Sequence, residues 1–215
     1  MKKLALNVFA LTVLLILIVA ALDIFSSYRP SATVRGDAPV YAVQKITIQA
    51  PSDKVWRVLS QIDHWEEWQT DISHPKLSGP LQAGSNFSWK TNGARIQSTL
   101  HTVVPNAELG WYGKSFGRFA IHNWSLRQVG DSTEVTVEES MEGWLVQLLS
   151  GRFQNKLDAA MDNSLQALKQ QTEQQTGQQT VQQPGQQTKK QAGNAPAGQN
   201  ASHAAAAHAS ASAML

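Results

Sequence analysis

A histidine and a glutamate occupy positions from which they could act together as an acid and a base. Alternate side chains of a strand share one face, so the segment RFAIHNWSL places His122 on the same face as Trp124. The same alternation places Glu139 on the face of Val137. A histidine hydrogen-bonded to a carboxylate in a partly buried site can transfer protons, provided that the two side chains meet. The spacing leaves open the alternative that His122 is a core residue with satisfied hydrogen bonds and that Glu139 emerges at the sheet edge.

Other chemistry-bearing motifs in the chain lack the context that they require. The stretch GKSFG (113–117) matches the G-x-S-x-G pattern of serine hydrolases, with Ser115 as the nucleophile. That motif works where a strand turns into a helix, but here another strand pattern follows, which predicts a hairpin turn instead. The histidines show no metal-ligand spacing, and the sequence has no phosphate-binding loop and no cysteine. We therefore expect no metal and no cofactor.

The first 22 residues are apolar enough to form a transmembrane anchor. After Lys2 and Lys3, residues 4–22 hold no charged side chain, and a helix of that length spans about 28 Å. No small-residue cleavage site follows the apolar run, which favours an uncleaved anchor over a secretory signal. The two lysines predict a cytoplasmic start. The domain would then lie on the extracytoplasmic side, periplasmic or extracellular, of a single-pass membrane protein, and the alternative is secretion after cleavage.

Composition divides the rest of the chain into a linker (23–39), a domain (40–170) and a tail (171–215). The tail is a QQTx repeat followed by an alanine-rich tract, and it can bury too little apolar surface to fold, which predicts disorder. The net charge of +2 includes four lysines in the anchor and tail, at positions 2, 3, 189 and 190. The domain is therefore close to neutral and has no basic patch, which argues against nucleic acid as a partner. We expect a monomer.

The periodicity of the domain predicts an α+β fold. Residues 40–50 alternate as a strand, and apolar residues at helical spacing then predict a helix near 53–60 and a shorter one at DHWEEW. Segments with period two follow, separated by turn dipeptides such as Gly130-Asp131, as in an antiparallel sheet of about six to seven strands. From Gly143 to Leu168 the apolar spacing is helical. This predicts one long helix, bent near Gly151, against the concave side of a curved sheet.

These segments also resemble a known superfamily in their order and spacing. The resemblance rests on ITIQAPSDKVWRVLSQIDHWEEWQ, LGWYG, HNWSL, GDSTEVTVEESMEG and the closing helix. Over about residues 40–170 the chain is similar to the polyketide cyclase/dehydrase branch of the START-like (SRPBCC) helix-grip superfamily. The resemblance implies a helix-grip fold, in which the sheet wraps around the C-terminal helix and encloses a cavity. It is specific for the fold and says little about the function.

The implied cavity would be lined by the apolar face of each strand. Ser98, His122 and Glu139 share those faces, and a few polar groups among aromatic rings are the usual composition of a small-molecule pocket. Trp56, at the strand-to-helix junction, is expected in the core. Trp65 and Trp68 lie three residues apart on one helix face, and they are candidates for a ligand gate or membrane-facing lip, with plain packing as the alternative. The expected ligand-binding residues are Trp65, Trp68, Phe87, Trp89, Ser98, Leu100, Trp111, His122, Trp124, Val137, Leu149, Phe153 and Leu157.

Three functions remain open at this point. The favoured one is a non-catalytic, membrane-tethered module that binds a hydrophobic or amphipathic molecule, such as a lipid, an isoprenoid or an aromatic polyketide-like compound. The second, implied by the family, is a cyclase/dehydratase-type enzyme with His122 and Glu139 as acid and base. The third is a structural or partner-binding protein whose cavity is filled by its own side chains. An aromatic lining needs no catalyst, which favours the first.

Overall fold

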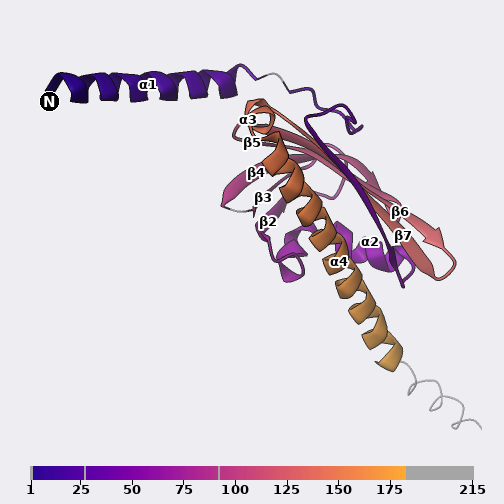
Figure 1. Cartoon of the computed structure of the whole chain (residues 1–215). Helices are drawn as coiled ribbons and strands as arrows, with labels where there is room; N and C mark the ends of the chain where they lie inside the picture. The colour runs from indigo at the N-terminus through magenta and orange to yellow at the C-terminus, as the bar shows by residue number, and fades with distance from the viewer. Residues whose placement is uncertain (1, 27, 92, 183–215) are drawn as a thin grey trace, which may run out of the picture. The chain divides into compact units, whose positions relative to one another are not determined.

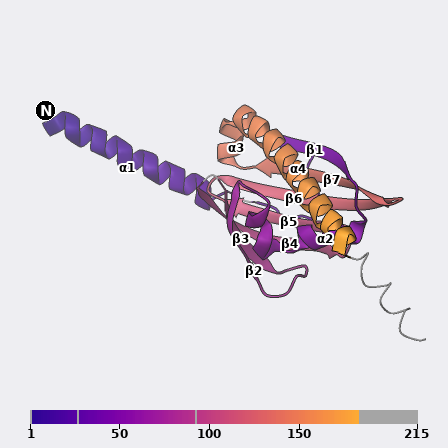
Figure 2. The ribbon, with the colours of Figure 1, turned by 90° about the horizontal axis from the view of Figure 1, so that it is seen from below.

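One antiparallel sheet, with a long helix across its inner face, makes up most of residues 40–182 (Figures 1 and 2). The structure is a computed structural model that describes residues 2–26, 28–91 and 93–182. The sheet has seven strands in the order β1-β7-β6-β5-β4-β3-β2. This confirms the predicted α+β helix-grip fold. The elements are α1 (Lys2–Ile24), β1 (Val40–Ile48), α2 (Ser52–Ser60), η1 (Ile62–Glu67), β2 (Ile72–Ser78), β3 (Asn86–Thr91), β4 (Ala94–Val104), β5 (Glu108–Ser115), β6 (Arg118–Val129), β7 (Ser132–Glu142), α3 (Trp144–Leu148) and α4 (Ser150–Gln182).

The core lies between the sheet and α4 because both present an apolar face. On β7, Val135 and Val137 are fully buried. The facing residues of α4 recur every three or four positions, which keeps them on one side of a helix. They are the buried Leu157, Met161, Leu165 and Leu168.

The predicted single helix after Gly143 is interrupted, and it is longer than expected. It breaks at Leu149, which has φ −125° and ψ 31°, and not at Gly151. At its other end α4 continues past residue 170 to Gln182. Lys169 Nζ donates a hydrogen bond to the Thr47 carbonyl (2.9 Å), and the Gln49 amide donates one to Glu173 Oε1 (2.8 Å). Contacts with the end of β1 thus extend the helix into the predicted tail, whose residues 183–215 lie outside the described part of the chain.

The predicted linker packs on the outer face of the sheet. The Tyr28 ring stacks on Phe119 with centroids 5.3 Å apart. The Arg35 guanidinium forms an ion pair with Glu142 (2.6 Å), and the Arg35 amide donates to Ser140 Oγ (3.1 Å). Asn123 Nδ2 donates to the Ala32 carbonyl (2.9 Å). These contacts cover outer-face residues of β6 and β7, while the opposite face of the same strands remains turned toward α4.

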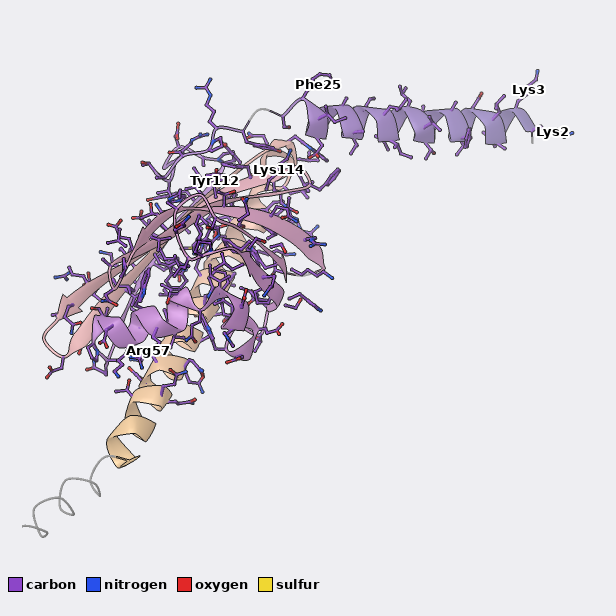
Figure 3. All side chains as sticks on the ribbon, turned by 180° about the vertical axis from the view of Figure 1, so that it is seen from behind. Lys2, Lys3, Phe25, Arg57, Tyr112 and Lys114 are labelled. Atoms are coloured by element: carbon purple, nitrogen blue, oxygen red, sulfur yellow. The ribbon has the colours of Figure 1, made fainter. Side chains whose placement is uncertain are left out.

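Within the described residues, α1 is the one helix with the length and hydropathy of a membrane span. Figure 3 shows side chains around the whole of this helix, with Lys2 and Lys3 at its beginning and Phe25 just after its end. None of its residues is buried. Length and composition alone fit both a membrane anchor and a signal sequence.

Candidate functional site

A cavity of about 380 Å³ lies between the inner face of the sheet and α4. Its walls are mainly apolar and aromatic, and they come from β2 to β7, from α2, η1 and the segment after it, and from α4. Strand alternation explains the contribution of β6, where Ala120, His122 and Trp124 are two residues apart and all turn inward. A volume of this size lies within the range of natural small-molecule pockets.

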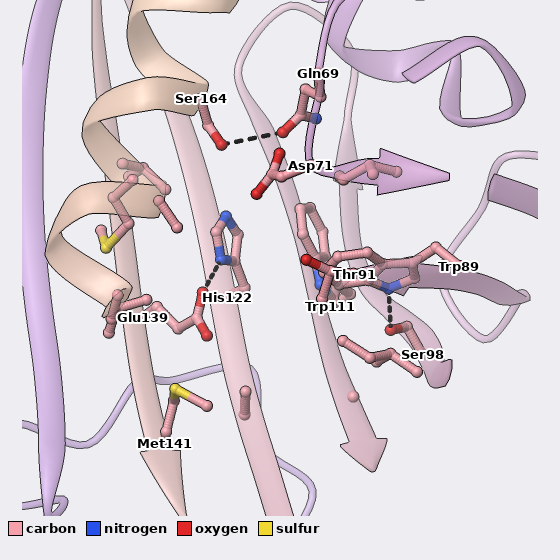
Figure 4. Close-up of a pocket in the computed structure, with 18 of the residues that line it drawn as sticks. Gln69, Asp71, Trp89, Thr91, Ser98, Trp111, His122, Glu139, Met141 and Ser164 are labelled. Carbon is pink, nitrogen blue, oxygen red and sulfur yellow. Dashed lines mark hydrogen bonds and ion pairs between the residues drawn. The ribbon is translucent and has the colours of Figure 1, made fainter. Parts of the chain in front are cut away.

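Packed aromatic rings form one wall of the cavity. The centroid of Trp111 lies 5.3 Å from that of Trp65 and 5.7 Å from that of Phe87. On its other side Trp111 stacks on the His122 imidazole at 4.3 Å, with an interplanar angle of 15°. This packing leaves His122 one main orientation, with an edge of its ring toward the cavity, as Figure 4 shows.

His122 and Glu139 meet inside the cavity. They are direct cross-strand partners on β6 and β7, and His122 Nδ1 lies 2.5 Å from Glu139 Oε2. Their side chains are only 13% and 16% exposed. A carboxylate accepts hydrogen bonds, so the proton of this bond belongs on Nδ1, and the other ring nitrogen, Nε2, takes no part in it. Nε2 is buried and has no hydrogen-bond partner among the described residues.

The remaining polar groups of the cavity are mostly paired with one another. Trp89 Nε1 donates to Ser98 Oγ (3.2 Å), and Ser164 Oγ donates to Gln69 Oε1 (3.0 Å), the latter beside Asp71 in Figure 4. These bonds hold the side chains that they join in place, because breaking one would leave polar groups without a partner.

A cationic group lies where the β5–β6 turn meets the start of α4. Gly117, with φ 64°, closes this turn, so GKSFG is the predicted hairpin and Ser115 is followed by a strand. Arg118 Nη2 donates to Ser115 Oγ (3.0 Å), and its guanidinium carbon lies 5.7 Å from the centroid of Phe153. Burial lowers the pKa of Arg118 below the ordinary guanidinium value. Lys156, three residues after Phe153 on α4, lines the cavity too.

Most of the side chains expected to bind a ligand do line this cavity. Ligand binding by them stays a prediction, which the structure makes geometrically possible. They are Trp65, Trp89, Ser98, Trp111, His122, Trp124, Val137, Phe153 and Leu157, with Glu139 beside His122.

Four expected residues do not line it. Trp68, Phe87 and Leu100 are buried in the core, where Phe87 packs edge-to-face against Trp65 (5.6 Å). Leu149 is displaced because the helix breaks at this residue, which leaves its side chain 37% exposed. Trp65, at 1% exposed, is both a cavity wall and a core residue, and its Nε1 donates to the Leu59 carbonyl (2.9 Å). Trp56, which was expected in the core, is only partly buried and packs against it.

Sequence reasoning missed several polar lining residues, although a signal existed for one of them. Arg118 stands four residues before His122 on the same strand, so alternation places both on one face. The sequence also contained a signal for the contact of His122 with Glu139. A two-residue turn at Gly130-Asp131 pairs Val129 with Ser132, and counting back from it pairs position 122 with 139. The other polar lining residues that were missed are Gln69, Asp71, Thr91, Ser115, Lys156 and Ser164.

The described residues contain no group of three or more histidine, aspartate or glutamate side chains arranged to hold a metal ion. His122 and Glu139 face each other in the cavity with no third such residue joining them.

The family model described as polyketide cyclase / dehydrase and lipid transport matches residues 40–173, which is the sheet together with most of α4. The chain belongs to this family. No curated protein matches the chain. Solved structures with the same fold share little sequence with this family member, so they are evidence for the fold alone.

Three of those solved structures illustrate the match. A hypothetical protein from Helicobacter pylori is 16% identical with a TM-score of 0.58, and the match covers 68% of this chain and 99% of that one. A Thermus thermophilus protein is 14% identical with a TM-score of 0.54, over 61% and 96% of the two chains. The Zhui aromatase/cyclase from a Streptomyces species is 12% identical with a TM-score of 0.55, over 63% and 94%. The long matched share of each neighbour shows that the domain is a complete example of the fold.

Proposed function

We propose that the protein binds a hydrophobic or amphipathic small molecule in the cavity between the sheet and α4. The observation that carries this proposal is the 380 Å³ of open space inside an otherwise packed domain, with aromatic walls and a few inward polar groups. A protein whose own side chains served only as a structural core would fill such a space, because protein interiors are close-packed. Family membership supports a hydrophobic ligand-binding or cyclase-type function.

We further propose that α1 tethers this domain to a membrane, with the domain on the extracytoplasmic side. The apolar surface of α1 and the lysines at its start support this placement. A tether would hold the cavity close to a source of apolar ligands. The ligand class is then a lipid, an isoprenoid or an aromatic polyketide-like compound.

Native mass spectrometry of the purified full chain tests the binding function. Under the proposal, a mass increment that organic extraction removes accompanies the protein, and the extract identifies the molecule. A protein that carries no increment and takes up no apolar compound on incubation contradicts the proposal.

A second candidate, a cyclase/dehydratase-type enzyme, is favoured by one specific contact. His122 lines the cavity, its Nε2 has no hydrogen-bond partner among the described residues, and Glu139 holds its Nδ1, which is the pairing of a general base oriented by a carboxylate. The Zhui neighbour is an aromatase/cyclase by its description. Under this proposal, His122→Ala and Glu139→Ala abolish conversion of the identified ligand but change its affinity by no more than about tenfold, 1.4 kcal/mol. Conversion that survives both substitutions rules the pair out.

A further inference from the structure

Arg118 is a partly buried cation without an anion. Its two neighbours, Ser115 Oγ and the Phe153 ring, are both neutral. No acidic side chain forms an ion pair with it anywhere in the described residues. Arg35 and Arg127, by contrast, pair with Glu142 and Glu134. Arg118 therefore brings to the cavity a charge with which no acidic side chain of the described residues pairs, although Asp71 and Glu139 also line the cavity.

Such a charge is unfavourable unless something pairs with it. A buried charge is stable only with a counter-charge and satisfied hydrogen bonds, and Arg118 Nε is a buried donor with no partner. Desolvation accordingly lowers the pKa of Arg118, although a guanidinium stays protonated in proteins. Arg118 lines the cavity, and a planar guanidinium matches the two oxygens of a carboxylate or a phosphate.

The surroundings of Arg118 reinforce its positive charge. Lys156 lines the same cavity from α4, and no ion pair of its ammonium occurs among the described residues. The first turn of α4, which begins at Ser150, has no acidic residue to offset the positive end of the helix dipole. Glu139 is hydrogen-bonded to His122 and does not pair with Arg118. His122 lies four residues after Arg118 on β6, which is about 13 Å along the strand.

Between these two polar places the cavity wall is apolar. Ala120 lies between Arg118 and His122 on β6, and Met141 on β7 is its cross-strand partner. We propose that the ligand is an amphipathic anion, whose carboxylate or phosphate group binds Arg118 while its apolar body lies along Ala120 and Met141 toward His122. This inference rests on the proposed binding function and specifies the class of its ligand.

Four naphthyl probes with one apolar body and different head groups test this inference. They are 2-naphthoate, 2-naphthyl phosphate, naphthalen-2-ylmethanol and naphthalen-2-ylmethylammonium. Each is titrated calorimetrically into the full chain in zwitterionic lipid nanodiscs, with empty nanodiscs as the blank. The wild-type protein should bind at least one anion more tightly than the alcohol and the ammonium by about tenfold or more, 1.4 kcal/mol. Whichever anion binds better shows whether the site prefers a carboxylate or a phosphate.

Substitutions then assign the effect to Arg118. Arg118→Gln should bring the affinities for the anion and the alcohol to within about threefold, and Arg118→Lys should retain part of the preference. Arg127→Gln is the matched control, because Arg127 lies on the same strand and pairs with Glu134 outside the cavity. It should bind all four probes as the wild type does.

The outcomes separate this inference from the binding function on which it rests. If the wild type binds the alcohol as tightly as the anions, or if Arg118→Gln keeps the anion preference, the inference is overturned while the cavity remains a binding site. If no probe binds the wild type, the inference is overturned, and the binding function fails with it only when native mass spectrometry also finds no removable mass increment.

Discussion

Replacing Trp65 with phenylalanine should destabilise the domain by about 2–4 kcal/mol. The indole Nε1 donates to the Leu59 carbonyl, which lies in the last turn of α2 and has no helical partner for its oxygen. Leaving that buried carbonyl unpaired costs about 1–3 kcal/mol. The three ring atoms that are lost leave a void beside Phe87 and Trp111, which costs about 1 kcal/mol more.

Urea unfolding followed by tryptophan fluorescence measures this change. All seven tryptophans lie between positions 56 and 144, so the signal reports on the domain even in the full chain. Trp56→Phe is the control, because Trp56 is only partly buried, and it should cost less than about 1 kcal/mol. If Trp65→Phe leaves stability unchanged but speeds ligand exchange, Trp65 is a mobile gate and the packing argument is wrong.

Three further predictions concern the pH dependence of stability, the packing of α4 and the membrane anchor. Burial lowers the pKa of His101 in the folded protein below the value of 6.5 that it has in the unfolded chain. The unfolded chain therefore binds more protons than the folded protein, and the free energy of unfolding should fall as the pH drops below 6.5. His101→Gln should flatten this pH dependence in unfolding titrations. Leu168→Ala, at a fully buried position of α4, should cost about 2–5 kcal/mol in urea unfolding, whereas Leu148→Ala, at a side chain 71% exposed, should change stability by less than about 0.5 kcal/mol. The full chain should stay in the membrane fraction after alkaline extraction, and a variant lacking residues 2–24 should be released; release of the full chain would contradict the tether.

Local patterns in the sequence were sufficient to predict the sheet, the long helix and part of the cavity wall. Alternation in each strand decides which face a side chain takes, and it correctly places His122, Glu139 and Trp124 inward. The position of the β6–β7 turn then fixes which residues lie opposite each other. These features depend on neighbours in the chain, which is why they can be read from it.

The features that were missed depend on contacts between distant segments. Whether Phe87 faces the cavity or the core is decided by the ring of Trp65, which comes from another element. The extension of α4 into the glutamine-rich segment depends on bonds to the end of β1. The packing of Tyr28 on Phe119 joins positions that no local period relates. Cavity volume is likewise a property of the assembled walls.

The most direct test of ligand binding in the cavity is to fill it. Ala160 on α4 lines the cavity, while its neighbour Ala159 is exposed and does not. We predict that Ala160→Phe weakens binding of the tightest naphthyl probe by at least about a hundredfold, 2.7 kcal/mol, with an intact unfolding transition, and that Ala159→Phe binds as the wild type does. Equal binding by the wild type and both variants would show that ligands bind elsewhere and would contradict the proposed function.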